Sequence, residues 1–473
     1  MNSKLIAVTA VAVIIVASAA AAIIVLNDDD DEKKDYKIDT KLEVYGNADG
    51  DDDVDSDDAD LIQQWIDAVN SDDNDKQTEL KQMINLDFAD ADNNGTIDSK
   101  DVEQTKAIAN GEATHLWFQD GIQKDRDMDI GDSIQKVGCE YFTGVETMLI
   151  LGLADKIAAV DFAPWQYLDF YFTDDQKKNI SNLNNMNEPD YDAVNKLNLD
   201  VLLIFSSTAN YEAKQDKLVG TDVLYLGLYN PDIINTQSSS FIQGILKAGY
   251  IFGAVDKARA YTQWILEYRD KMLSIEESIP EADKPVVLMS NYTQSYFCTG
   301  AGDQVPAYTQ NDPLGQAVIL AGGINIHEKL GTDYGSKYSV KINLDSLFTE
   351  AGTVDYICLH NVKYTYGGMT MASTPAHGYL QDDDTEFRNA IDIALGQSFV
   401  TTETVAMMAG DFRNGCTGGV LLAAYLGNLI NPEQYSSIDP VDMHNEYVKF
   451  LGIEGYDVGE HGVFFEYGKN PTS

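Results

Sequence analysis

The pattern of apolar and polar positions divides the chain into three parts. Residues 6–26 form an uncharged apolar run, residues 42–115 carry two short amphipathic helical patterns, and apolar runs alternate with helical patterns over residues 116–473. Strands that alternate with helices are typical of parallel sheets covered by helices on both faces. We therefore expect an α/β protein that follows a small α-helical module and an N-terminal transmembrane helix.

A long helical pattern separates two alternating series. Over residues 256–280 apolar positions recur at helical spacing, and Pro280 and Pro285 end the pattern. A helix of this length spans about 36 Å, enough to cross from one lobe to another. We predict an N-terminal lobe over residues 116–255 and a C-terminal lobe over residues 281–473. Ligands of such sheets bind at the carboxyl ends of strands, so we expect a binding cleft between the lobes.

The individual elements of the lobes follow from the same pattern. The expected strands are residues 134–139, 157–160, 200–205, 223–226, 286–289 and 354–359. The expected helices, besides the linking helix, are residues 143–153, 191–197, 239–252, 313–321, 344–349 and 420–429.

The N-terminal apolar run is long enough to cross a membrane. As a helix, residues 6–26 would span about 31 Å. Lys4 precedes the run and acidic residues 28–32 follow it, so the rest of the chain should be exported. A cleaved signal peptide is the alternative, although its apolar core is usually shorter. We interpret residues 1–26 as a signal anchor and residues 27–41 as a charged tether, with the bulk of the chain extracellular.

The charge balance narrows the choice of partners. The chain has 77 Asp and Glu against 32 Lys and Arg, a formal net charge of −45 at pH 7. Nucleic-acid backbones and anionic lipid head groups both require clustered cations, so this balance argues against both as partners. An acidic surface instead attracts cations and suits an extracellular setting.

The helical module contains two copies of one acidic loop pattern. Side-chain oxygens stand at the first, third, fifth and twelfth positions, an apolar residue stands at the eighth, and the seventh can offer its carbonyl, as calcium loops require. We predict two structural Ca²⁺ sites, with Val54 and Ile97 pairing the loops and pointing into a small common core. The candidate ligands are Asn47, Asp49, Asp51, Asp53 and Asp58 in the first loop and Asp90, Asp92, Asn94, Thr96 and Asp101 in the second.

An Asp at the twelfth position and a single helix after each loop depart from the intracellular EF-hand. These residues resemble a dockerin, the paired calcium module of extracellular assemblies, over about residues 41–111. The resemblance implies two calcium ions and allows a cohesin-like partner domain, although the module could equally be a calcium-stiffened spacer. The first loop departs from the second in having Asp52 where the second has Gly95, which leaves its tight turn open.

Four stretches of the α/β region resemble the class III substrate-binding proteins of ABC importers, the group with ferric siderophore- and vitamin B12-binding members. They are residues 137–160 (VGCEYFTGVETMLILGLADKIAAV), 196–204 (KLNLDVLLI), 249–258 (GYIFGAVDKA) and 312–325 (DPLGQAVILAGGIN). In the second stretch Leu199 replaces the usual proline. The resemblance implies two α/β lobes on one long helix. It also implies capture of a metal chelate (a ferric siderophore, corrinoid or haem-like ligand) and delivery to an ABC permease.

A cleft of this kind needs aromatic surface and a few polar groups near strand ends. Arg413 could bind a ligand carboxylate or phosphate with its planar guanidinium, and His360 could be an axial metal ligand. The ligand-binding candidates are Tyr141, Trp165, Ser207 and Tyr229 in the first lobe and Tyr292, Tyr296, His360, Tyr364 and Arg413 in the second.

The same resemblance implies one acidic residue on each lobe that pairs with arginines of the permease. By position these are Asp192 and Asp345. The sequence lacks a nucleophile elbow, a zinc-protease motif and a phosphate-binding loop, so we expect a binding protein and not an enzyme. The main alternative is a cell-surface adhesion or assembly protein that acts through the calcium module. A chelatase-like two-lobed enzyme is the third.

Overall fold

The computed structural model describes most of the chain beyond the N-terminal segment. The described residues are 38–185, 188–206, 211–229, 232–235, 239–292, 297, 303–344, 347, 354–362, 375–397, 399–400 and 402–469. The expected signal anchor and most of the expected tether lie outside these residues. Within the described part of the chain, no helix is both long enough and apolar enough to cross a membrane.

The first lobe is built on a parallel five-stranded sheet with the order β5-β4-β3-β6-β7. Every residue of β3, β6 and α6 is buried, and the two strands accordingly form continuous apolar runs in the sequence. The strands are β3 (Val137–Cys139), β4 (Ile157–Asp161), β5 (Ser181–Asn184), β6 (Val201–Leu203) and β7 (Asp222–Leu224). The helices are α6 (Tyr141–Ile150), α7 (Phe162–Trp165), α8 (Leu168–Tyr171), α9 (Asp174–Lys177), α10 (Tyr191–Asn195), α11 (Tyr211–Lys217) and α12 (Ser240–Phe252).

The second lobe has its own five-stranded sheet with the order β10-β8-β12-β13-β14, parallel except for the antiparallel edge strand β14. A separate antiparallel pair, β9 and β11, lies beside it. The strands are β8 (Val286–Asn291), β9 (Gln304–Tyr308), β10 (Ile324–Asn325), β11 (Ser339–Asn343), β12 (Tyr356–His360), β13 (Thr404–Met408) and β14 (Phe465–Lys469). The helices are α15 (Pro313–Leu320), α16 (Ile326–Lys329), α17 (Thr385–Leu395), α18 (Asp411–Asn414), α19 (Val420–Ile430) and α20 (Pro440–Phe450).

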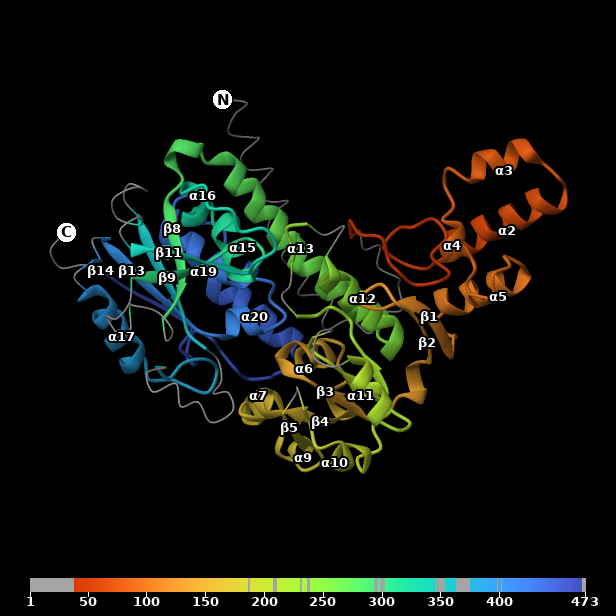
Figure 1. Ribbon diagram of the computed structural model, residues 1–473, viewed down its shortest axis with the longest axis horizontal. Coiled ribbons are helices and arrows are strands. Elements are labelled where there is room, and N and C mark those ends of the chain that lie inside the picture. The colour runs from red at the N-terminus through yellow and green to blue at the C-terminus, as the bar shows by residue number, and fades with distance from the viewer. Residues whose placement is uncertain are drawn as a thin grey trace, which may run out of the picture.

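Helix α13 (Val255–Ser278) joins the two lobes, as Figure 1 shows. It follows α12 through Gly253, whose φ of 72° ends α12 in the left-handed conformation. Tyr261, Trp264 and Met272 of α13 are buried in one hydrophobic cluster that also contains residues of α6, α15, α19 and α20. The lobes therefore share a packed core along α13.

A small helical module precedes the lobes and lies to one side of them (Figure 1). It consists of α2 (Ser56–Asn70), α3 (Asn74–Leu80), α4 (Leu86–Ala89) and α5 (Ser99–Ala109), which enclose a core of their own. The antiparallel pair β1 (His115–Gln119) and β2 (Asp125–Asp129) connects it to the first lobe, and Val44 forms a β-bridge with Phe118 of β1.

The expected architecture of two parallel-sheet lobes joined by one long helix is confirmed, and most expected elements are found within a few residues of their predicted bounds. The pairs β1–β2 and β9–β11 were missed because they are partly exposed and, in β2, largely charged. The edge strand β5 is polar and was missed for the same reason. The expected helix over residues 344–349 lies largely outside the described residues.

Candidate functional site

The carboxyl ends of the two sheets bring aromatic residues of both lobes together. In the first lobe, the Tyr141 ring lies 5.4 Å from the Tyr229 ring and 5.6 Å from the Phe205 ring. In the second lobe, the Tyr308 and His360 rings lie 5.9 Å apart, edge to face. Burial is the main cause of the raised pKa of Tyr308, and the nearby Tyr229 adds to it, so the two aromatic groups lie near each other.

Tyr141 links the two lobes directly. Its hydroxyl donates a hydrogen bond to Asn414 Oδ1 at 2.5 Å, and its N–H donates to Asp161 Oδ2 at 2.9 Å. Its φ of 64° is unusual for a residue with a side chain, and these two bonds hold it there. Tyr141 is therefore a fixed contact between the lobes, and its role toward a ligand stays a prediction.

A buried carboxylate forms a second contact between the lobes. Glu146 of α6 is 1% exposed and accepts hydrogen bonds from Tyr171 Oη (2.6 Å), Tyr447 Oη (2.6 Å) and the Cys416 N–H (2.7 Å). Burial, followed by the charge of Glu146, raises the pKa of both phenols well above the usual range, so they remain donors. Three donors compensate the carboxylate for its lost hydration.

Arg413 is already paired within the second lobe. Its Nη2 and Nε atoms lie 2.7 Å and 3.0 Å from Asp312 Oδ2, and its guanidinium lies 5.6 Å from the centre of the Tyr308 ring. Asp312 is fully buried and also caps α15 by accepting the Leu314 N–H. A ligand anion would have to compete with this bidentate pair for Arg413.

His360 stands at the carboxyl end of β12, and one of its ring nitrogens is buried without a hydrogen-bond partner in the described part of the chain. Its side chain is nearly buried (3% exposed), and Nδ1 lies 3.5 Å from Tyr308 Oη. Among the described residues, no group lies within hydrogen-bonding distance of Nε2. Burial first, and the nearby Arg413 second, lower its pKa well below the usual value, so the imidazole is neutral. A neutral imidazole with an unpartnered nitrogen can coordinate a metal that reaches it.

The remaining candidates occupy varied surroundings. Trp165 ends α7 and is 36% exposed, whereas Tyr292 is buried in the core of the second lobe. Asp192 is exposed in the first turn of α10. The other four candidates lie outside the described residues: Ser207, Tyr296, Tyr364 and Asp345.

The structure thus brings Tyr141, Tyr229, His360 and Arg413 to one region between the lobes, together with Tyr308 and Asp312, which the sequence did not single out. The Asp312-Pro313 pair is a recognisable helix start, with an N-cap followed by proline. That signal locates Asp312 but not its distant partner Arg413. A Glu in the apolar run around Glu146 was the available signal for a buried, partnered carboxylate.

The second acidic loop of the module brings three carboxylates together. One oxygen from each of Asp90, Asp92 and Asp101 lies within 4.8 Å of the others. Burial first, and then repulsion from Asp92 and Asp90, raise the pKa of Asp101. Asn94 is also hydrogen-bonded within the loop, where its N–H donates to Asp90 and its side chain accepts the Thr96 N–H. This oxygen-rich donor set fits Ca²⁺.

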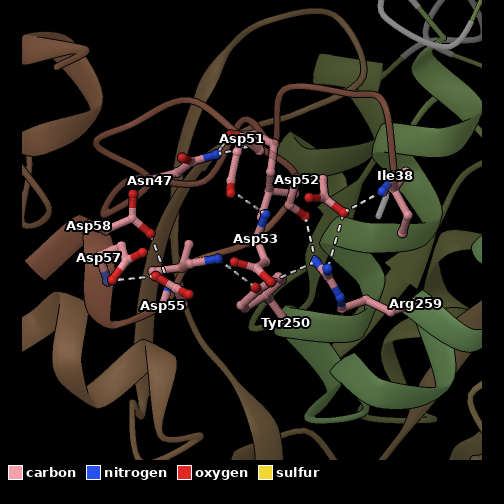
Figure 2. A network of polar contacts seen from close by, with 12 residues as sticks. Ile38, Asn47, Asp51, Asp52, Asp53, Asp55, Asp57, Asp58, Tyr250 and Arg259 are labelled. Carbon is pink, nitrogen blue, oxygen red and sulfur yellow. Dashed lines mark hydrogen bonds and ion pairs between the residues drawn. The ribbon is translucent and has the colours of Figure 1, made fainter. Parts of the chain in front are cut away.

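The first acidic loop has a similar hydrogen-bond pattern, although among the described residues only the second loop brings three carboxylates within 4.8 Å of one another. Asn47 stands where the second loop has Asp90, and Asp58 accepts the N–H groups of Ala48 and Asp49 at 2.7 Å and 3.0 Å. Burial raises the pKa of Asp58 to about 8. The side chain of Asp53, however, pairs with Arg259 of α13, so only its carbonyl is left to act as a calcium ligand (Figure 2).

The expected pairing of the two loops through Val54 and Ile97 is wrong. The Val54 N–H donates to Tyr250 Oη of α12 at 2.9 Å, and its side chain belongs to the core of the lobes. Ile97 packs instead against the separate core of the module. The module packs against α12 and α13, and this contact places Val54 apart from Ile97, the corresponding residue of the second loop.

Comparisons with known proteins identify a fold. No protein-family model matches the chain, and no curated protein matches it. A TroA-like periplasmic binding protein, FepB from Veillonella parvula, is 16% identical, with a TM-score of 0.56, over 74% of this chain and 99% of that one. The petrobactin-binding protein YclQ from Bacillus subtilis is 15% identical, with a TM-score of 0.47, over 67% of this chain and 99% of that one. The molybdate-binding protein MolA from Haemophilus influenzae is 12% identical, with a TM-score of 0.49, over 72% of this chain and 98% of that one.

Proposed function

We propose that this chain, which has the fold of TroA-like periplasmic binding proteins, is the extracytoplasmic substrate-binding protein of an ABC importer. The observation that carries the proposal is the match of its two lobes and linking helix to almost the whole of such a protein. The aromatic residues gathered between the lobes support it further, because ligands of open α/β sheets bind at the carboxyl ends of the strands.

The ligand that we propose is a metal chelate. The support is His360, whose neutral imidazole lies edge to face with the Tyr308 ring and whose buried Nε2 has no hydrogen-bond partner among the residues that the structure describes. Haem-like and corrinoid ligands present a flat apolar surface and a metal that can accept an axial nitrogen. A ferric siderophore would instead rely on the aromatic walls, since its iron is already coordinated.

Delivery to a permease and retention at the membrane complete the proposal. Asp192, exposed on α10, and Asp345 would pair with permease arginines, since exposed acids steer docking. Residues 6–26 would hold the protein at the membrane surface. Two Ca²⁺ ions would stabilise the module through the loop residues named above. The alternative role in adhesion or assembly would require a cohesin-like partner on the same module.

A spectroscopic titration tests the ligand proposal. The purified chain is titrated with haemin, with hydroxocobalamin and with a ferric catecholate siderophore, and binding is followed by absorbance and tryptophan fluorescence. We expect one probe to bind, and His360→Ala with Trp165→Ala to weaken it at least tenfold. For haemin or hydroxocobalamin, His360→Ala alone should also remove the spectral shift of axial ligation.

The matched control is His461→Ala, because His461 is an exposed histidine of the second lobe paired with Asp382. This variant should bind as the parent chain does. Unchanged affinity in the His360 and Trp165 double variant would place the ligand elsewhere and overturn the proposed pocket.

A further inference from the structure

The lobes carry two nearly buried cations on the side where the module leans. Lys247 of α12 is 1% exposed, with Nζ 2.8 Å from Glu43 Oε2 and 2.6 Å from the Gln119 carbonyl oxygen. Arg259 of α13 is 5% exposed and lies against the first acidic loop (Figure 2).

Arg259 contacts two consecutive residues of that loop. Its Nη2 lies 3.1 Å from Asp52 Oδ2, and its Nη1 lies 3.1 Å from Asp53 Oδ2. Nη1 also donates to the Asp52 carbonyl oxygen at 2.9 Å. Asp52 Oδ2 in turn accepts the Ile38 N–H, and the Val54 N–H donates to Tyr250. The sixth, seventh and eighth positions of the loop are therefore all bound to the lobes or to the segment that precedes the loop.

Losing this contact would be costly for the lobes. A buried guanidinium whose carboxylate partners leave is an uncompensated charge, which destabilises a fold far more than a surface pair stabilises it. The lobes therefore depend on the first loop holding Asp52 and Asp53 in place.

The proposed calcium ligands and these docking residues share one loop, and Asp53 belongs to both sets through its carbonyl oxygen and its side chain. Asp51 at the fifth position and Asp58 at the twelfth flank Asp52, Asp53 and Val54. A metal that fixes the fifth and twelfth positions also fixes the backbone between them. The second loop has no such attachment: among the described residues, the hydrogen bonds of its polar side chains stay within residues 90–101.

We propose that Ca²⁺ in the first loop and docking of the module on α12 and α13 through Arg259 form one linked equilibrium, so that this calcium ion stabilises the lobes. The second loop stabilises only the module. The inference rests on the proposed calcium sites and is independent of the ligand in the cleft.

Calorimetry of the full chain tests this link. Titration calorimetry counts the Ca²⁺ sites, and scanning calorimetry follows the lobe and module transitions in Ca²⁺ and in EGTA. We expect Ca²⁺ to raise the lobe melting temperature by about 5 °C. Arg259→Gln should abolish this rise and still bind two Ca²⁺. Arg259 contacts the side chain of Asp53, whose proposed ligand atom is its backbone carbonyl oxygen, and Asp52, which is not a proposed ligand. The matched control is Arg269→Gln, a buried arginine of the same helix that donates to the Ile233 carbonyl oxygen and should keep the rise.

A second pair of variants separates the two loops. Asp58→Asn and Asp101→Asn each replace the carboxylate at the twelfth loop position. Each of these residues also completes the capping box of the helix that follows its loop. We expect Asp58→Asn to remove the calcium-dependent rise of the lobe transition and Asp101→Asn to retain most of it. Three results would overturn the inference: no binding of Ca²⁺, a full rise in Arg259→Gln, or equal losses in the two aspartate variants. None of them bears on chelate binding, which the spectroscopic titration measures separately.

Discussion

The two acidic loops of the module share a ligand pattern and differ in what they are attached to. The first loop uses Asp52, Asp53 and Val54 to contact Arg259 and Tyr250 of the linking helices. The second loop places the corresponding residues within the module. A repeated metal-binding pattern therefore predicts the chemistry of each copy, and the residues between the ligands decide whether a copy also serves as an interface.

The backbone conformation at the sixth loop position also differs between the two loops. Gly95 of the second loop has a φ of 88°, a conformation that favours glycine. Asp52 is not among the residues with a left-handed φ, and its carboxylate points to Arg259. At this position the second loop forms a tight turn, whereas the first loop forms an ion pair.

Of the changes considered, removal of calcium should have the largest effect on the two loops and on the module that contains them. The small core of the module cannot hold four short helices without a metal, so EGTA should unfold α2 to α5, with loss of their far-ultraviolet circular dichroism. Hydrogen exchange should accelerate at least tenfold over residues 90–101 and less around Glu43, which Lys247 still holds. Equimolar Mg²⁺ serves as the control and should not restore the signal. An unchanged spectrum in EGTA would remove the calcium sites.

Truncation at the eighth loop position should separate the two cores. Val54→Ala removes a side chain that is 4% exposed in the core of the lobes and should lower lobe stability by about 2 kcal/mol. Ile97→Ala, in the core of the module and only partly buried, should cost about 1 kcal/mol there and leave the lobe transition in place. Urea unfolding followed separately for lobes and module measures both. Equal effects on one transition would mean that the loops share a core after all.

Exchange of the sixth residues should have the smallest effect. Gly95→Asp meets open space but forces a side chain into the left-handed region, which costs about 1 kcal/mol and should weaken Ca²⁺ binding at the second site about fivefold. Asp52→Gly should leave Ca²⁺ binding at the first site within about twofold and lower lobe stability by about 0.5 kcal/mol, since Asp53 still pairs with Arg259. Titration calorimetry measures the Ca²⁺ affinity of both variants. A larger loss of affinity in Asp52→Gly than in Gly95→Asp would contradict the prediction.

Much of the fold could be predicted from the sequence because it depends on local patterns. The buried strands β3, β6 and β12 are continuous apolar runs, and the spacing of α13 is helical along its length. The acidic loops could be predicted because calcium ligands are close together in the sequence.

The contacts between distant segments could not be predicted in this way. Arg259 and Asp52 are 207 positions apart, and Arg413 and Asp312 are 101 apart. Both arginines were visible as rare cations in an acidic chain, but their partners could not be chosen among 77 carboxylates. The neutral state of His360 likewise depends on burial at the end of β12, which no local pattern encodes.

The carboxylate of Glu146 is held by Tyr171 of one lobe and by Tyr447 and the Cys416 amide of the other, so it fixes the two lobes to each other at one buried point. Opening of the two lobes would leave a buried negative charge without hydrogen-bond donors, so the lobes keep a fixed spacing. For the proposed substrate-binding role, a fixed spacing of the lobes would favour ligands whose thickness matches it, and such a ligand would bind with little entropic cost for rearranging the protein.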